Sequence, residues 1–118
     1  MQFMMFMIPK DYNKAPADWE PDAKGRAAMV EMGKFNDAMQ KAGVVKSING
    51  LTPPAAGARI AFDGSKPTVT HGPFTQTTET VGGYWLLELK SQDEAIEWAK
   101  KCPAEPGDVI EIRQIAAF

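Results

Sequence analysis

The only histidine of the chain, His71, lies in the segment Val-Thr-His-Gly-Pro-Phe-Thr, directly before a Gly-Pro pair. An imidazole accepts and releases protons near neutral pH, so this residue is the best candidate for acid–base chemistry of the lyase or isomerase type. Glu79, in the polar stretch that follows, could orient the ring, as could Glu31 far upstream. In the alternative interpretation, His71 has a structural role and caps its turn by hydrogen bonding to the backbone of residues 75–78.

The other reactive groups of the chain favour structural roles. Cys102 is the sole cysteine, which excludes an internal disulfide, and it shares an apolar helical stripe with Trp98 and Ala99. A buried thiol in such surroundings stays protonated, so we expect packing rather than nucleophilic chemistry. Structural zinc prefers nitrogen and sulfur ligands, and these are too few here, so we expect no metal site. The Gly82-Gly83 pair precedes a strand and lacks a following Lys-Ser/Thr, so no phosphate loop and no cofactor is predicted.

The size and charge of the chain limit the classes of function that we expect. With 118 residues and 12.9 kDa, the sequence predicts one domain over residues 1–118 with a single core. The net charge is −2, and no cluster of Lys and Arg is present to follow a phosphate backbone, so nucleic acid is not an expected partner. The apolar N-terminal stretch lacks a basic region and a cleavage site, and it is much shorter than the roughly 20 apolar residues of a membrane span. We therefore expect a cytoplasmic protein without a membrane partner.

Two helices are predicted to position these side chains. Apolar residues recur at spacings of three and four over residues 22–42, and Gly43 is suited to the left-handed conformation that closes a helix. Gly33 weakens this helix by about 1 kcal/mol relative to alanine, which a close approach by another backbone would explain. Ser91 and Glu94 form a capping box at the start of the second helix.

Strands are predicted around these helices. The β-prone segments are residues 2–8, residues 44–51, a hairpin of residues 58–62 and 68–70 around an Asp-Gly turn, residues 84–89 and residues 109–115. The order is β-α-β, a hairpin insertion, then β-α-β. This order is typical of an α+β, ferredoxin-like fold with both helices on one face of an antiparallel sheet.

Two helices cover one face of such a sheet, but the strands carry large apolar groups on both faces. Met5 opposes Phe6 on the first strand, and Trp85 opposes Tyr84 on a later one. A second copy of the same sheet is the simplest cover for the remaining face, so the sequence predicts a homodimer.

Methionines and aromatic residues also predict an apolar pocket for a small-molecule ligand, because methionine adapts its shape to irregular spaces. The residues that we expect to line it are Met32, Phe74, Tyr84 and Trp85. The alternative is that the methionines simply fill the core between the sheet and the helices.

Residues 71–103, HGPFTQTTETVGGYWLLELKSQDEAIEWAKKCP, resemble the C-terminal signature of the YCII-related proteins. More narrowly, they resemble the DGPF subgroup, which carries Asp-Gly-Pro-Phe, a Thr/Glu-rich loop, Gly-Gly, an aromatic strand and an EAxEWAxxCP helix. The resemblance extends upstream through residues 41–62 and covers most of the chain. It implies a ferredoxin-like fold that pairs as a dimeric α+β barrel.

The resemblance says less about activity. The founding branch of the family carries a His–Asp pair at its proposed active site, on the first helix and directly before the proline after the second helix. Here these positions fall near Met32 and at Cys102, so that catalysis is not carried over. The aspartate of the subgroup before Gly-Pro-Phe is replaced by His71, at a strand end expected to face the barrel. This replacement favours turn capping, because Asp and His share that task more readily than one catalytic role.

Two functions therefore stay open. The first is a small-molecule site with acid–base chemistry at His71, and the second is a non-catalytic dimeric assembly or regulatory module. Some relatives that resemble this chain are fused to, or encoded beside, regulators similar to sigma factors, which supports the second.

Overall fold

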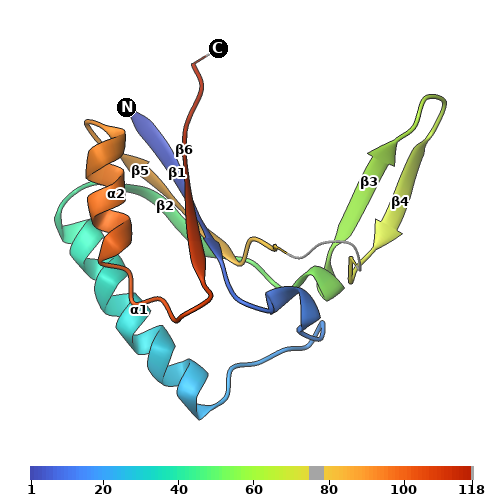
Figure 1. Cartoon of the computed structure of the whole chain (residues 1–118), viewed down its shortest axis with the longest axis horizontal. Helices are drawn as coiled ribbons and strands as arrows, with labels where there is room; N and C mark the ends of the chain where they lie inside the picture. Colours follow the sequence, from blue (N-terminus) through green and yellow to red (C-terminus); the bar gives the residue numbers. More distant parts are fainter. Residues whose placement is uncertain (75–78, 118) are drawn as a thin grey trace.

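The computed structural model describes residues 1–74 and 79–117, and its elements confirm the predicted α+β class. In chain order these are β1 (Gln2–Ile8), η1 (Tyr12–Lys14), α1 (Ala23–Lys41), β2 (Val45–Gly50), η2 (Pro54–Ala56), β3 (Ala58–Phe62), β4 (Pro67–His71), β5 (Gly83–Glu88), α2 (Gln92–Lys100) and β6 (Val109–Gln114) (Figure 1). None of the helices in this described part of the chain is long and apolar enough to cross a membrane.

Four strands form one antiparallel sheet in the order β2-β5-β1-β6, with α1 and α2 packed on the same face. The core between this face and the helices consists of Phe3, Met5, Phe35, Met39, Trp85, Leu87, Leu89 and Ala95. The predicted alternation along β1 and β5 is confirmed, because the side chains between these core positions lie on the opposite, open face. On β1 and β5 this open face carries half-buried side chains, namely Met4, Phe6, Ile8, Tyr84 and Leu86. At its edge, β6 adds the exposed Glu111 and Arg113 opposite Phe6 and Met4.

Local hydrogen bonds fix the helix ends as predicted. Gly43 closes α1 with a φ of 76°, in the left-handed region. At α2, the hydroxyl of Ser91 accepts a hydrogen bond from the backbone N–H of Glu94, at 3.2 Å. The Glu94 carboxylate accepts from the N–H of Lys90 at 2.9 Å and not from the N–H of Ser91, so the second half of the predicted capping box is shifted by one residue. The explanation offered for Gly33 is wrong, since a Cβ added there would meet nothing within 4 Å.

The first half of α1 extends beyond the sheet. Consequently Phe35 and Met39 are buried, Met32 is half-buried, and Met29 and Val30 are 60% and 61% exposed. The predicted apolar stripe is therefore only partly covered, and its overhanging half borders a cavity.

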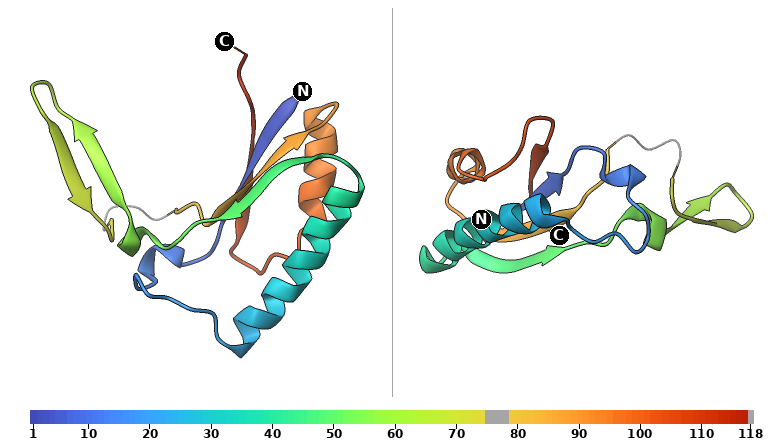
Figure 2. Two further views of the ribbon diagram at one scale, coloured as in Figure 1. Left: turned by 180° about the vertical axis from the view of Figure 1, so that it is seen from behind. Right: turned by 90° about the horizontal axis from the view of Figure 1, so that it is seen from below.

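The predicted hairpin forms a separate two-stranded sheet, β3–β4, which we call the arm (residues 58–71). The arm stands apart from the four-stranded sheet, which lies between it and α2 (Figures 1 and 2). The two strands are joined at the base of the arm by Gly72, whose N–H donates to the carbonyl of Gly57 at 2.9 Å. The guanidinium carbon of Arg59 lies 4.4 Å from the ring centroid of Phe74, which fixes the base from the other strand.

Candidate functional site

A cavity of about 530 Å³, the main cavity, lies between the overhanging half of α1 and the loops that leave β1 and enter β6. Its apolar wall is formed mainly by Met7, Tyr12, Trp19, Met29, Met32 and Leu51. Ligand sites commonly have volumes of about 300–1,000 Å³ and mostly apolar walls. The main cavity has both properties.

Two aromatic residues of the loop after β1 build one wall of the main cavity. The rings of Tyr12 and Trp19 meet edge to face, with centroids 5.7 Å apart. The Tyr12 hydroxyl donates to the carbonyl of Leu51 at 2.7 Å and so ties this loop to the end of β2. Burial raises the pKa of Tyr12, so the phenol stays protonated. The two aromatic residues thus fix this loop, and sequence reasoning missed their place at a cavity.

A smaller cavity of about 160 Å³, the minor cavity, adjoins the main one and shares Met7 and Met32 with it. The indole N–H of Trp85 donates to Oδ1 of Asn36 at 2.7 Å. This bond leaves the amide nitrogen of Asn36 as a hydrogen-bond donor in the wall of the minor cavity. Sequence reasoning missed Asn36, although a carboxamide one residue after a buried phenylalanine was a possible signal.

Tyr84 also contributes to the minor cavity, while its hydroxyl lies toward β2. It accepts a hydrogen bond from the amide nitrogen of Asn49 at 2.9 Å and lies 3.3 Å from the hydroxyl of Ser47. The hydrogen bonds with Ser47 and Asn49 lower the pKa of Tyr84. The open face thus carries an oriented phenol beside its apolar centre.

Four charged residues line the main cavity, namely Lys10, Asp11, Glu105 and Asp108, and the carboxylate of Asp108 is used by the backbone. The Asp108 carboxylate accepts from the N–H groups of Lys10 and Glu105, both at 2.9 Å, and so closes the turn before β6.

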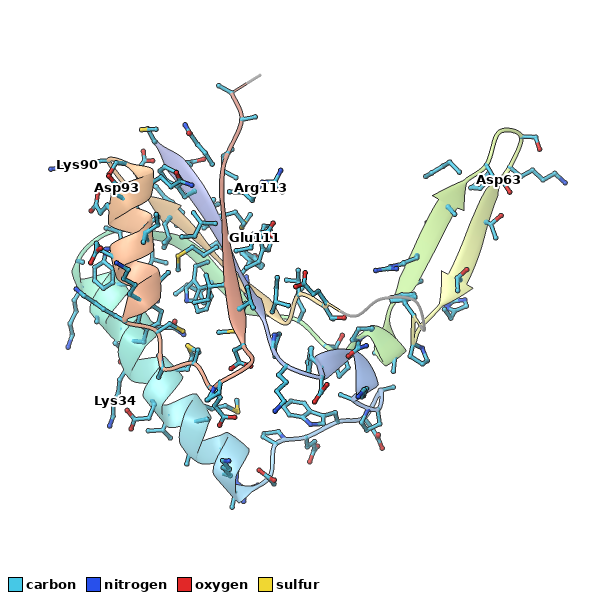
Figure 3. The ribbon with its side chains drawn as sticks, in the orientation of Figure 1. Lys34, Asp63, Lys90, Asp93, Glu111 and Arg113 are labelled. Carbon is cyan, nitrogen blue, oxygen red and sulfur yellow. The ribbon has the colours of Figure 1, made fainter. Side chains whose placement is uncertain are left out.

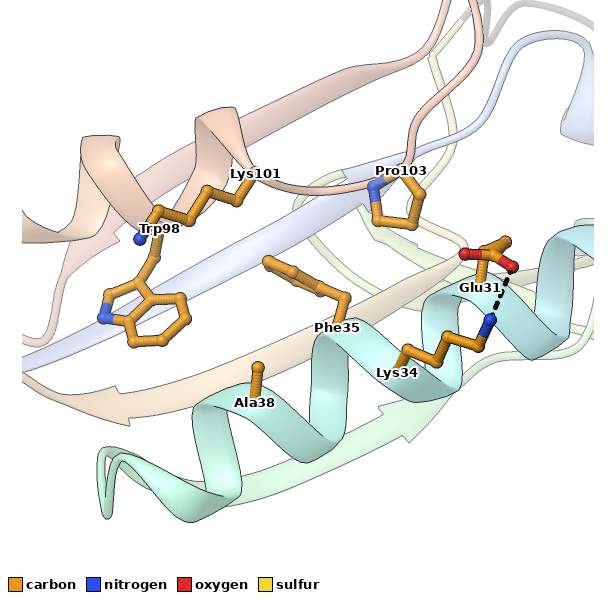
Figure 4. Close-up of a pocket in the computed structure, with 7 residues that line it drawn as sticks. All are labelled: Glu31, Lys34, Phe35, Ala38, Trp98, Lys101 and Pro103. Atoms are coloured by element: carbon orange, nitrogen blue, oxygen red, sulfur yellow. Dashed lines mark hydrogen bonds and ion pairs between the residues drawn. The ribbon is translucent and has the colours of Figure 1, made fainter.

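A separate groove of about 290 Å³ lies between α1 and α2 (Figure 4). There Lys34 pairs with Glu31 at 3.0 Å on the surface. Among the described residues, no group of three His, Cys, Asp or Glu side chains is placed to bind a metal.

Met32 and Cys102 meet at the edge of the main cavity. The Cys102 sulfur lies 3.9 Å from the Met32 sulfur, although 70 residues separate the two. The resemblance places the proposed His–Asp pair of the founding branch near Met32 and at Cys102, and in this chain two sulfur atoms meet in that region. Burial, and secondarily the charge of Asp108, raises the pKa of Cys102 to about 11. The thiol therefore stays protonated at neutral pH, as its apolar stripe predicted.

Cys102 is expected to react about 200-fold more slowly with iodoacetamide at pH 8 than the same thiol in the urea-unfolded chain. A thiol with a pKa of about 11 is about 0.1% ionised at pH 8, whereas an ordinary thiol is about one-quarter ionised. The rate should rise about tenfold per pH unit until pH approaches 11. Mass spectrometry of the alkylated protein measures both rates, and equal rates in folded and unfolded chain would contradict the assignment.

The structure places His71 away from both cavities. It lies at the end of β4, opposite Ala58, and is exposed. Since β4 pairs with β3, this strand end does not belong to the four-stranded sheet. Glu79 is also exposed, and no contact joins it to His71 in the part of the chain that is described. The alternative turn cap depends on the backbone of residues 75–78, which lie outside the described residues.

The predicted lining residues separate into two groups. Met32, Tyr84 and Trp85 come together around the minor cavity. Phe74 is half-buried at the base of the arm, against Arg59, and lines neither cavity.

Comparison with known proteins assigns the chain to a family. The whole chain, residues 1–118, matches the YCII-related domain family. An uncharacterised protein of Rhizobium meliloti (strain 1021) is 32% identical over 82 residues, which are 70% of this chain and 65% of that relative. The match thus spans less than two thirds of the relative.

Proposed function

The chain belongs to the YCII-related domain family, and on that premise we propose that it binds a small, largely apolar molecule in the main cavity. The observation that carries this proposal is the wall of methionines and aromatic rings that surrounds the main cavity, which has a volume of about 530 Å³. Methionine side chains adapt to ligands of different shape. The free donor of Asn36 in the adjoining minor cavity favours a ligand with an oxygen acceptor at one end.

The proposal includes a dimeric α+β barrel of the DGPF subgroup, located in the cytoplasm. The antiparallel strand order β2-β5-β1-β6 supports a ferredoxin-like topology. The apolar open face supports pairing with a second sheet, because no helix of the described chain covers it. The same face favours the alternative function, in which the dimer is a non-catalytic assembly or regulatory module.

Acid–base chemistry at His71, with Glu79 orienting the ring, is part of this proposal only if a second chain brings its ligand to His71. His71 lines neither cavity of its own subunit, so the ring can reach a ligand only if another copy brings its cavity to the arm. Ligand binding needs no such assembly.

A pair of neighbouring substitutions tests ligand binding. Met29 and Val30 are adjacent on α1 and almost equally exposed, but only Met29 lines the main cavity. In a thermal-shift screen of small carboxylates, phenols and ketones, we expect some compounds to raise the melting temperature of the wild type. For these compounds, Met29→Trp should weaken affinity at least about tenfold by filling the cavity, and Val30→Trp should leave it within about twofold.

Fluorescence titration of each compound that raises the melting temperature gives the affinities, because Trp19 and Trp85 lie in the cavity walls. Absence of any shift in the wild type would count against the proposal. Equal binding by Met29→Trp and the wild type would exclude the main cavity as the site.

A further inference from the structure

The chain exposes far more surface than a compact monomer of its mass. Its accessible surface is 8205 Å², whereas a monomeric protein of 12.9 kDa exposes about 6,300 Å². Its radius of gyration is 16.0 Å, compared with about 13.5 Å for a compact domain of this length. The excess of about 1,900 Å² is in the range of about 1,000–2,500 Å² that each subunit buries in a permanent dimer. The excess surface is therefore large enough to be buried by a second protein chain, and it is much larger than a small ligand would cover.

The arm accounts for a conspicuous part of this exposure, since every residue of β3 and β4 is exposed. The register places Ile60 opposite Val69 and Phe62 opposite Pro67, so these side chains share one face. That face also carries Ala58 at its base, opposite His71. Three of its side chains are large and apolar, with exposures of 57% for Ile60, 82% for Phe62 and 56% for Val69.

The other face of the arm is more polar. It carries Arg59 and Ala61 on β3, opposite Thr70 and Thr68 on β4. Such a difference between faces is typical of a sheet with one side packed against protein and the other in water. An isolated two-stranded hairpin is at best marginally stable in water, so the apolar face needs a cover.

The chain does not cover this face itself. The hydrogen bond between Gly72 and Gly57 and the stacking of Arg59 on Phe74 join the two ends of the arm at its base. Gly72 also packs tightly against the backbone of Pro54, which places this base on η2. Figure 3 shows Asp63 at the tip of the arm, far from Glu111 and Arg113 on β6. The arm is thus anchored to the body while its apolar face stays open.

We propose that the apolar face of the arm packs on a second copy of this chain, so that each subunit of the dimer clasps the other. This inference rests on the dimer of the proposed function and adds the contact that stabilises it. Because His71 shares this face, the clasp carries the imidazole of one subunit into the interface with its partner. In this arrangement, the sole histidine of the chain contacts a ligand or a carboxylate of the second chain.

The test measures the dimer dissociation constant of the full chain by analytical ultracentrifugation between about 0.1 and 100 μM. The double variant Ile60→Thr and Phe62→Ser should weaken the dimer at least about 30-fold, because large side chains at the centre of an interface carry most of the binding energy. Both side chains are exposed in the single chain, so the variant should keep its circular dichroism spectrum. The matched control Thr68→Ala, on the opposite face of the arm, should change the constant less than about threefold.

The outcomes separate the two levels of the proposal. A wild type that is monomeric at 100 μM overturns both the dimer and the clasp. A wild-type dimer whose affinity the double variant leaves unchanged, or which Thr68→Ala weakens equally, overturns the clasp and leaves the dimer standing. Selective weakening by the double variant supports the clasp.

Discussion

Replacement of Gly72 by alanine is expected to detach the base of the arm from the body of the protein. A Cβ atom at this position would overlap the backbone carbonyl of Pro54 in η2, and backbone atoms cannot rotate away as a side chain can. The tight contact explains why the Gly-Pro-Phe segment begins with glycine. Overpacking of this kind destabilises by about 1–3 kcal/mol or more. We therefore expect a lower urea midpoint, and loss of hydrogen-exchange protection at Gly72, whose N–H is bonded to Gly57.

Gly33→Ala is the matched control, because it adds the same methyl group at a glycine with nothing within 4 Å of the new atom. Alanine is the better helix former, so this change should stabilise the protein by up to about 1 kcal/mol. Opposite signs for the two substitutions are the expected result. Unchanged stability and unchanged protection in Gly72→Ala would show that the base of the arm moves freely.

Truncation of the core residue Leu87 to alanine is expected to cause a large loss of stability. Leu87 is 0% exposed and packs between the sheet and the helices. Removal of a fully buried leucine side chain costs about 2–5 kcal/mol, a large part of the stability of a small domain. Urea unfolding at two protein concentrations measures this loss, which should be similar at both because the contacts lie within one chain.

The neighbouring residue Leu86 is the control for the other side of the same strand. It lies on the open face and is half-buried in the single chain. Its truncation should cost less than that of Leu87 at low protein concentration. If the open face pairs with a second sheet, the loss should appear as a weaker dimer and grow with protein concentration. Equal losses of stability for both truncations at every protein concentration would contradict the assignment of Leu86 and Leu87 to opposite faces of β5.

The main cavity combines a largely apolar wall with a rim that carries charged side chains, among them Lys10, Asp11 and Glu105. Met32 and Cys102 place two sulfur atoms in contact there, and the thiol is held protonated. Polar groups such as Asn36 and Tyr12 can orient a bound molecule by hydrogen bonds. The proposed binding needs only one subunit, whereas the proposed chemistry at His71 needs a second one.

The sequence alone determined the elements that depend on local physics. The strand at residues 2–8, the helix closed by Gly43 and the capping box of Ser91 and Glu94 all follow from periodicity and short-range hydrogen bonds. The two-sided apolar pattern of β1 was also visible, because alternation along a strand needs no knowledge of its neighbours.

The tertiary structure decided where these elements meet. Trp19 lies in the wall of the main cavity because the loop after β1 folds back against α1. Met32 touches Cys102 across 70 residues of sequence. The predicted hairpin formed, but its separation from the main sheet moved His71 away from both cavities. Local periodicity specifies each strand and helix, whereas these placements depend on long-range packing, which no short segment contains.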